Sequence, residues 1–235
     1  RILAVTATIV LGLALVFSQS RMGIFSLLAA GVTIGVASAL LRPRSRPRRM
    51  VRTHRWALPA VFTLTLLSFS LVIGIGPVLE RFFDIPQDLE QGRMPAWQPA
   101  LAMWRDAPML GHGWDNYKSL WPAYANHPTG LYYRHAHNEY LQLLAETGLA
   151  GAAIVAYPLF LFARRTVGAL SRPLSHAQRS VTIALAAGIT SIVFHSTADF
   201  GLRIPGVSFT FILIVALFVR ITEDPSLIDG RDAQA

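Results

Sequence analysis

The sequence predicts an all-α membrane protein with about six transmembrane helices and one long extracytoplasmic loop. Of its 235 residues, 53% are hydrophobic and 14% are charged, whereas a soluble domain carries about 25% charged residues. Six runs contain no charged residue, at positions 2–20, 22–41, 57–79, 147–163, 180–198 and 204–219. A helix needs about 17–25 apolar residues to cross the hydrocarbon layer. The first three runs are long enough, and flanking Tyr, His and Arg residues at the interface extend the last three.

The placement of the charged residues predicts which side of the membrane each loop occupies. Seven arginines lie between positions 42 and 55, and four more lie between 164 and 179. Lys and Arg beside membrane spans mark the cytoplasmic side. Residues 80–146 hold five Lys/Arg against eight Asp/Glu, so we expect this loop outside. The net charge of +8 therefore reflects topology and does not indicate a nucleic-acid partner.

These signals divide the chain into four parts. Residues 1–79 form three spans with an Arg-rich cytoplasmic loop at 42–56, residues 80–147 form the extracytoplasmic catalytic loop, residues 148–221 form three further spans, and residues 222–235 form a cytoplasmic tail. The absence of cysteine excludes disulfides and thiol chemistry. Because the chain runs from Arg1 directly into an apolar segment without a charged n-region, we expect it to be the C-terminal part of a longer protein.

The external loop differs in composition from the rest of the chain. It holds four of the five tryptophans and four of the seven histidines. Residues 95–104 predict a short amphipathic helix with Trp97, Leu101 and Trp104 on one face, and residues 137–146 predict a second helix leading into the next span. Anchoring at the lipid headgroups explains the tryptophans but not the histidines.

Three residues are the main candidates for chemistry. Arg21 lies at the outer end of a span, where a cation needs an anion, water or protein beside it, and Arg93 precedes the 95–104 helix. Planar guanidinium groups bind phosphate oxygens in pairs. The ordinary pKa of histidine suits His137 to proton transfer near neutral pH. Each residue also has a simpler interpretation: Arg21 as an interface anchor, Arg93 as a surface charge and His137 as the start of a helix. His135 and His137 are two residues apart and make a weak metal pair, so no metal is expected.

Several motifs resemble the superfamily of bacterial O-antigen ligases and O-antigen polymerases, which are membrane glycosyltransferases. They occur in the family's order and cover nearly the whole chain. The first are Ser18-x-Ser20-Arg21 and Arg93-x-x-x-Trp97-x-x-Ala100-Leu101, then Pro108-x-x-Gly111-x-Gly113. The strongest is His137-Asn138-Glu139-Tyr140-Leu141-Gln142, continued by Glu146-Thr147-Gly148-Leu149-Ala150-Gly151. A weaker one is His195-Ser196 with Asp199-Phe200 and Pro205.

The resemblance implies a GT-C-like fold in the bacterial cytoplasmic (inner) membrane, with the active site on the periplasmic side. The implied donor is a glycan linked to undecaprenyl diphosphate, and no metal or cofactor takes part. Carried over residue by residue, Arg21 and Arg93 would hold the donor diphosphate, and His137 would deprotonate the acceptor hydroxyl. The lipid A core is the first choice of acceptor, as in O-antigen ligation.

Trp114, Tyr117 and Tyr124 have two interpretations. Their rings either stack on the sugars of a glycan or anchor the loop at the lipid headgroups.

Secondary site candidates and other functions have alternatives as well. Arg134 and His135 lie within one turn of His137, either in the donor or acceptor site or at a solvated loop edge. His195 and Asp199 are four residues apart on one helical face and either orient a substrate group or form a structural pair. The alternative functions are O-antigen polymerase, protein O-oligosaccharyltransferase and small-anion (inorganic carbon) transporter. A transporter would place ionisable groups near the membrane midplane.

Overall fold

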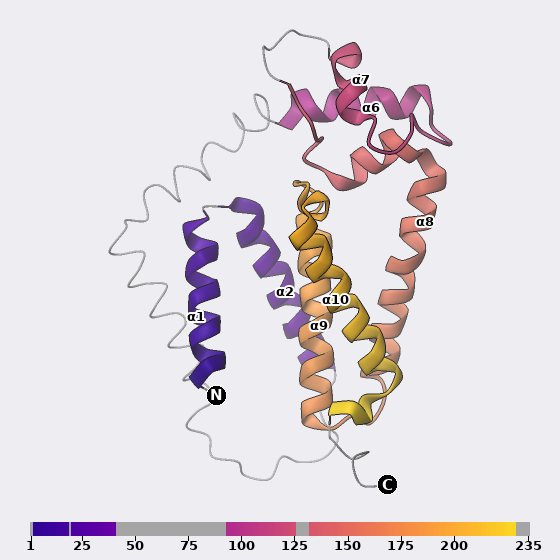
Figure 1. Cartoon of the computed structure of the whole chain (residues 1–235). Helices are drawn as coiled ribbons and strands as arrows, with labels where there is room; N and C mark the ends of the chain where they lie inside the picture. The colour runs from indigo at the N-terminus through magenta and orange to yellow at the C-terminus, as the bar shows by residue number, and fades with distance from the viewer. Residues whose placement is uncertain (1, 19, 41–92, 126–131, 229–235) are drawn as a thin grey trace. The chain divides into compact units, whose positions relative to one another are not determined.

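The computed structural model describes residues 2–18, 20–40, 93–125 and 132–228. Within these ranges every regular element is helical, and there is no strand. The helices are labelled in Figure 1. They are α1 (Ile2–Phe17), α2 (Arg21–Leu40), α6 (Met94–Asp106), α7 (Tyr117–Tyr124), α8 (Glu139–Leu170), α9 (His176–His195) and α10 (Pro205–Glu223), with 3₁₀ turns η2 (Gly201–Arg203) and η3 (Pro225–Ile228).

Four of the described helices, α2, α8, α9 and α10, are long and apolar enough to cross a membrane. Helix α1 is apolar but shorter. The expected third span at 57–79 and the Arg-rich loop at 42–56 lie outside the described residues. The regular structure of the described residues is therefore all helical, as expected of a multi-pass membrane protein. The count of six spans stays a prediction.

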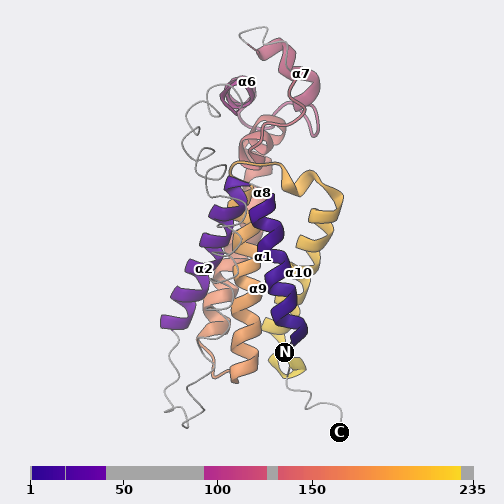
Figure 2. The same ribbon diagram turned by 90° about the vertical axis from the view of Figure 1, so that its left-hand side faces the viewer.

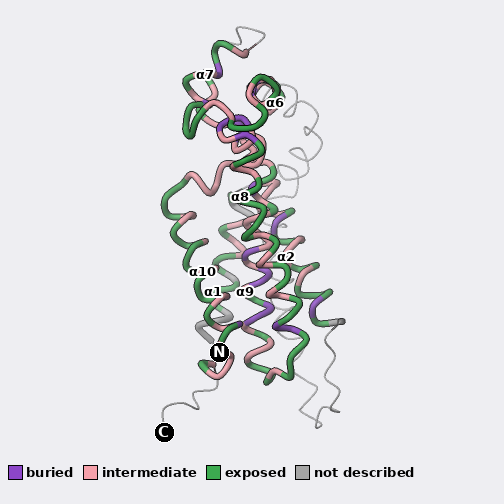
Figure 3. The backbone as a smooth tube through the Cα atoms, turned by 90° about the vertical axis from the view of Figure 1, so that its right-hand side faces the viewer, coloured by how far each residue is buried: buried purple, intermediate pink, exposed green. Residues whose placement is uncertain are grey.

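The chain divides into two compact units. The first comprises Arg1–Phe25 with Arg42–Pro86, and the second comprises Ser26–Leu41 with Gln87–Ala235. In the second unit α9 packs along α8 and α10, as Figures 1 and 2 both show. Ala186, Ile189 and Phe218 are buried where these helices meet. Their outer faces are exposed (Figure 3). Many of the exposed residues are large and apolar, as expected of surfaces that face lipid.

Helices α6 and α7 pack against the first turns of α8 and form a small core outside the three-helix group. This core contains Ala100, Met103, Tyr117 and Trp121. The predicted helix at 95–104 is present as α6, but its fully buried face carries Ala96, Ala100 and Met103 rather than the tryptophans. The small alanines allow α7 to approach closely, so that the Tyr117 hydroxyl donates to the Ala96 carbonyl at 2.7 Å.

The helices on either side of the second arginine cluster, at 164–179, extend further than the sequence predicted. The expected loop at 164–179 is mostly helical, because α8 continues to Leu170 and α9 begins at His176. A capping box between Ser175 and Gln178 fixes the start of α9. The tail expected from Thr222 begins later, since α10 runs to Glu223 and η3 follows.

A bend at Gly148 separates the first turns of α8, which pack with α6 and α7, from the long apolar part of the helix. Gly148 has φ +61° and ψ −161°, a region that essentially only glycine adopts. The loop before α7 docks onto this bend: Leu149 N donates to the Pro108 carbonyl at 2.8 Å, and Gly113 N donates to the Glu146 carbonyl at 2.8 Å. A Cβ on Gly148 would lie 2.4 Å from the Met109 carbonyl carbon. The Gly111-x-Gly113 and Glu146-Thr147-Gly148 motifs are thus two sides of one close backbone contact.

Candidate functional site

The segment leading into α8 presents His137 in an unusual backbone conformation. His137 has φ +50°, which is uncommon for a residue with a side chain and is often found at functional sites. The helix begins only after it, because Asn138 is the N-cap and its Oδ1 accepts from Leu141 N at 3.0 Å. The prediction that His137 begins a helix is therefore wrong by two residues. His137 lies in a tight turn fixed by the cap that follows it.

Asp199 lies between two histidines. It follows the C-terminal end of α9, and its Oδ2 is 3.2 Å from His195 Nε2. Its other oxygen, Oδ1, is 3.8 Å from His137 Nδ1, with side chains 39% (His137) and 35% (Asp199) exposed. We call His137, His195 and Asp199 the Asp199 cluster. Helical spacing predicts the His195–Asp199 contact, whereas the contact with His137 joins two distant segments.

The electrostatics of the Asp199 cluster favour an ionised carboxylate. The imidazoles of His137 and His195, in that order, hold the pKa of Asp199 well below its usual range, against the opposing effect of burial. Phe200 N also donates to Asp199 Oδ1 at 2.8 Å. A carboxylate beside a histidine Nδ1 favours the tautomer with its proton on that nitrogen. The opposite nitrogen, Nε2 of His137, is then left to accept a proton.

Phe200 lies between His137 and His135. The His135 ring stacks on it at 4.7 Å between centroids, and the His137 ring meets it edge-on at 4.8 Å. Burial lowers the pKa of His135, with the positive charge of Arg203 as the second cause. His135 Nδ1 is buried, and no hydrogen-bond partner for it occurs within the described residues. His135 is therefore held in its neutral form and packs against Phe200. His137 is the better candidate for a base.

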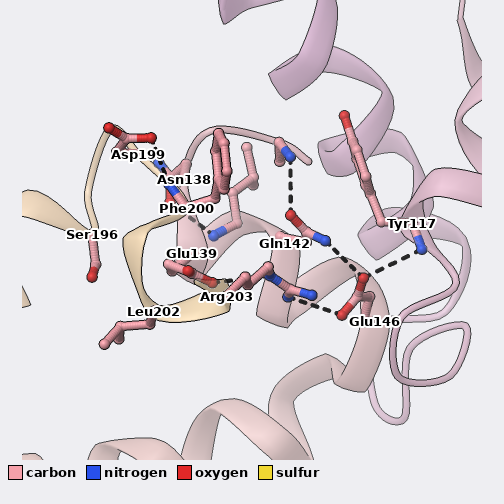
Figure 4. A network of polar contacts seen from close by, with 12 residues as sticks. Tyr117, Asn138, Glu139, Gln142, Glu146, Ser196, Asp199, Phe200, Leu202 and Arg203 are labelled. Atoms are coloured by element: carbon pink, nitrogen blue, oxygen red, sulfur yellow. Dashed lines mark hydrogen bonds and ion pairs between the residues drawn. The ribbon is translucent and has the colours of Figure 1, made fainter. Parts of the chain in front are cut away.

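A polar network joins the turn after α9 to the first turns of α8 (Figure 4). The sequence did not predict it. Arg203 Nε donates to Glu139 Oε2 at 3.1 Å, and Arg203 Nη2 donates to Glu146 Oε2 at 3.0 Å. Glu146 Oε1 in turn accepts from Gln142 Nε2 at 2.9 Å. We call Arg203, Glu139 and Glu146 the arginine clamp. The sequence did contain a signal for this network. Glu139 and Glu146 are seven residues apart and so share one face of a helix, where a single cation can reach both.

The three candidate arginines lie in different settings. Arg21 is the first residue of α2 and belongs to the first compact unit, whereas the Asp199 cluster belongs to the second. Arg93 is the N-cap of α6 and is partly exposed, and Arg134 is exposed in the segment before His137. The structure thus brings together His135, His137, His195 and Asp199, and Arg21 lies in a separate unit from them.

The aromatic candidates for sugar stacking also separate. Tyr117 is 1% exposed and belongs to the core, so that alternative is wrong for it. Tyr124 is held by a hydrogen bond from its hydroxyl to Asp106 Oδ2 at 2.8 Å. Trp114 is exposed, with the Arg203 guanidinium 5.3 Å from its ring centroid, so sugar stacking stays a prediction for Trp114 and Tyr124.

The described residues contain no group of three or more His, Asp or Glu side chains arranged to hold a metal ion. What they do contain is a partly exposed imidazole facing a carboxylate, an arrangement suited to removing a proton from a hydroxyl group. Such a pair can activate the hydroxyl group of an acceptor. It carries no information about the donor of the transferred group.

Comparison with known proteins supplies the family. A search of curated proteins and one of solved structures gave no significant match. A family model described as O-antigen ligase matches residues 6–156, which is well over half of the chain. The matched region includes most of α1, then α2, α6, α7 and the first half of α8, and so contains Arg21, Arg93 and His137. With its apolar helices and this match, the chain belongs to the O-antigen ligase family of membrane glycosyltransferases.

Proposed function

We propose that this protein transfers a glycan from undecaprenyl diphosphate to an acceptor hydroxyl on the extracytoplasmic face of the bacterial inner membrane. The observation that carries the proposal is the contact of His137 with Asp199, 3.8 Å between Nδ1 and Oδ1, at a partly exposed site beside the start of a membrane helix. The family match supports the reaction class.

In the proposed step, His137 Nε2 accepts the proton of the acceptor hydroxyl. The acceptor oxygen attacks the anomeric carbon of the donor sugar from the face opposite the diphosphate. The bond from that carbon to the diphosphate oxygen breaks, and its electron pair leaves with the diphosphate, so the anomeric configuration inverts. Asp199 stabilises the imidazolium that forms, as the aspartate does in other acid–histidine pairs.

Arg21 and Arg93, assigned by resemblance, would bind the diphosphate. Negative charge grows on its oxygens as it leaves, so fixed guanidinium donors would stabilise the transition state more than the bound donor. Diphosphate is a stable leaving group and needs no protonation by the protein. The proposed reaction therefore requires one base and two cations, without a metal or a cofactor.

The lipid A core is the proposed acceptor, with a growing glycan (polymerase) and a protein hydroxyl (oligosaccharyltransferase) as the alternatives within the family. The transporter alternative has less support. The apolar stretches 22–40, 148–163, 180–194 and 206–219 contain no Asp, Glu, Lys, Arg or His. The polar contacts described above gather instead where α8 begins and α9 ends.

The test is a reconstituted transfer assay. Purified protein in vesicles receives an undecaprenyl-diphosphate-linked oligosaccharide and, in parallel reactions, lipid A core, free glycan or an acceptor peptide. We expect equal amounts of free undecaprenyl diphosphate and newly glycosylated acceptor. Hydrolysis of the donor without transfer to any acceptor, or no reaction of the donor, would contradict the proposal.

A further inference from the structure

The arginine clamp connects the two segments that carry the proposed base and its carboxylate. Arg203 belongs to the same turn as Asp199, four residues later, and Glu139 follows His137 by two residues. The guanidinium bonds both Glu139 and Glu146 through different nitrogens, at 3.1 and 3.0 Å. Glu139 N also donates to the Ser196 carbonyl at 2.9 Å. The clamp therefore joins the turn that carries Asp199 directly to the start of α8.

The clamp is largely shielded from solvent, which distinguishes it from a surface ion pair. The side chains of Arg203 and Glu139 are each 13% exposed, and that of Glu146 is 1% exposed. Salt screens such contacts much less than exposed ones. Glu146 is held on its other oxygen by Gln142 Nε2 and, at 3.3 Å, by Tyr117 N, so its position is fixed independently of Arg203.

The geometry requires an arginine. Glu139 and Glu146 are separated by two turns of helix, and one planar fork reaches both because it presents donors on Nε and Nη2. A lysine ammonium keeps the positive charge but acts as a single point. One edge of the Arg203 guanidinium donates to the two carboxylates. The Trp114 ring lies near it as well, with its centroid 5.3 Å from the guanidinium carbon.

We infer that Arg203 is a positioning residue that holds Asp199 against His137, and that Glu139 and Glu146 serve the clamp instead of acting on the substrate. The inference rests on the proposed function. It explains why two acids of the His137–Gly151 motif lie next to a proposed base without either contacting it in the described structure: their charge holds a turn that comes more than fifty residues later.

The positioning role predicts how far kcat falls in the single and double variants. If Arg203 acts only through Asp199, losing the clamp cannot cost more than losing the Asp199 charge. Arg203→Lys is expected to lower kcat by up to the factor seen for Asp199→Asn, with the KM for the lipid-linked donor unchanged. The double variant should be no slower than Asp199→Asn alone, because residues acting as one unit are non-additive.

The experiment combines this cycle with a distance measurement that does not depend on activity. Because the protein has no cysteine, spin labels are placed on Thr197→Cys and Ser119→Cys, both at exposed positions. The distance distribution should be narrow in the parent and broader in Arg203→Lys. Arg165→Lys is the matched control, since the Arg165–Glu223 pair is exposed and lies at the other end of α8. If Arg203→Lys inserts poorly, Glu139→Gln is used in its place. This variant removes one charge of the clamp and leaves the Arg203–Glu146 ion pair in place.

The outcomes separate the two proposals. An unchanged distance distribution, a rise in donor KM alone, or a double variant that multiplies the two single losses would overturn the positioning role. Broadening with normal kcat would overturn it as well. If the parent transfers no glycan, or if His137→Ala stays active, the proposed function fails, whereas broadening confined to Arg203→Lys would still establish the clamp as the element that orders the turn.

Discussion

Asp199→Asn is the substitution that best isolates the electrostatic part of the proposed mechanism. Asparagine keeps the shape of the side chain and removes its charge. In the parent, this charge lies 3.8 Å from His137 Nδ1 and would stabilise the imidazolium formed when the acceptor loses its proton. The variant should fold and insert normally, because Asp199 lies in the partly exposed turn after α9.

The magnitude follows from the distance and the exposure. Two unit charges 4 Å apart attract by about 1 kcal/mol in water and about 4 kcal/mol near a protein surface. The side chains are 39% and 35% exposed, so screening places the interaction near the lower value, at about 1–2 kcal/mol. Each 1.36 kcal/mol is tenfold in rate, so kcat should fall by about 5- to 30-fold.

The assay is glycan transfer from the lipid-linked donor in membranes, normalised to protein level. Asp115→Asn is the matched control, because Asp115 is an exposed acid in the segment between α6 and α7 and pairs with Lys118. Its activity should stay within about twofold of the parent, as expected for an exposed ion pair. Parental activity of Asp199→Asn, or an equal loss in Asp115→Asn, would refute the reasoning.

Three further predictions test other parts of the account. Arg21→Lys and Arg93→Lys should each insert normally yet lose about 10²–10³-fold in transfer, as for lost transition-state donors, with little further loss in the double variant; near-full activity would make both arginines interface anchors. An impermeant thiol reagent applied to intact spheroplasts should label Ser119→Cys and not Ser171→Cys; the reverse would invert the topology. Gly148→Ala should lower the apparent Tm in detergent, since its φ of +61° costs about 1–3 kcal/mol with a side chain, whereas Ala at Gly168, which has open space around it, should not.

The long apolar helices were predictable because lipid imposes a simple rule: a span needs a long uncharged run, and its backbone must bond internally. The runs at 22–41, 180–198 and 204–219 correspond to α2, α9 and α10. The helix ends were less predictable. Arg164 and Arg165 seemed to open a loop, but Arg165 reaches Glu223 at 2.9 Å, and a contact between distant segments does not show in local composition.

The candidate site was predictable only in part. His195 and Asp199 are neighbours on a helix turn, so their contact follows from spacing. The approach of Asp199 to His137 and the pairing of Arg203 with Glu139 depend on how the turn after α9 folds onto α8, which the sequence pattern does not reveal. Tyr117 was misjudged for a similar reason: an aromatic residue in a loop reads as exposed until a second helix, here α6, is found covering it.

The most direct test of the central claim is the activity of His137→Ala in the reconstituted transfer assay. The variant should bind the lipid-linked donor, insert at the parental level and lose about 10²–10⁴-fold in kcat, the range for a general base. His176→Ala, an exposed histidine at the start of α9, should keep parental activity. Transfer by His137→Ala within a few-fold of the parent, at equal protein level, would contradict the assignment of His137 as the base.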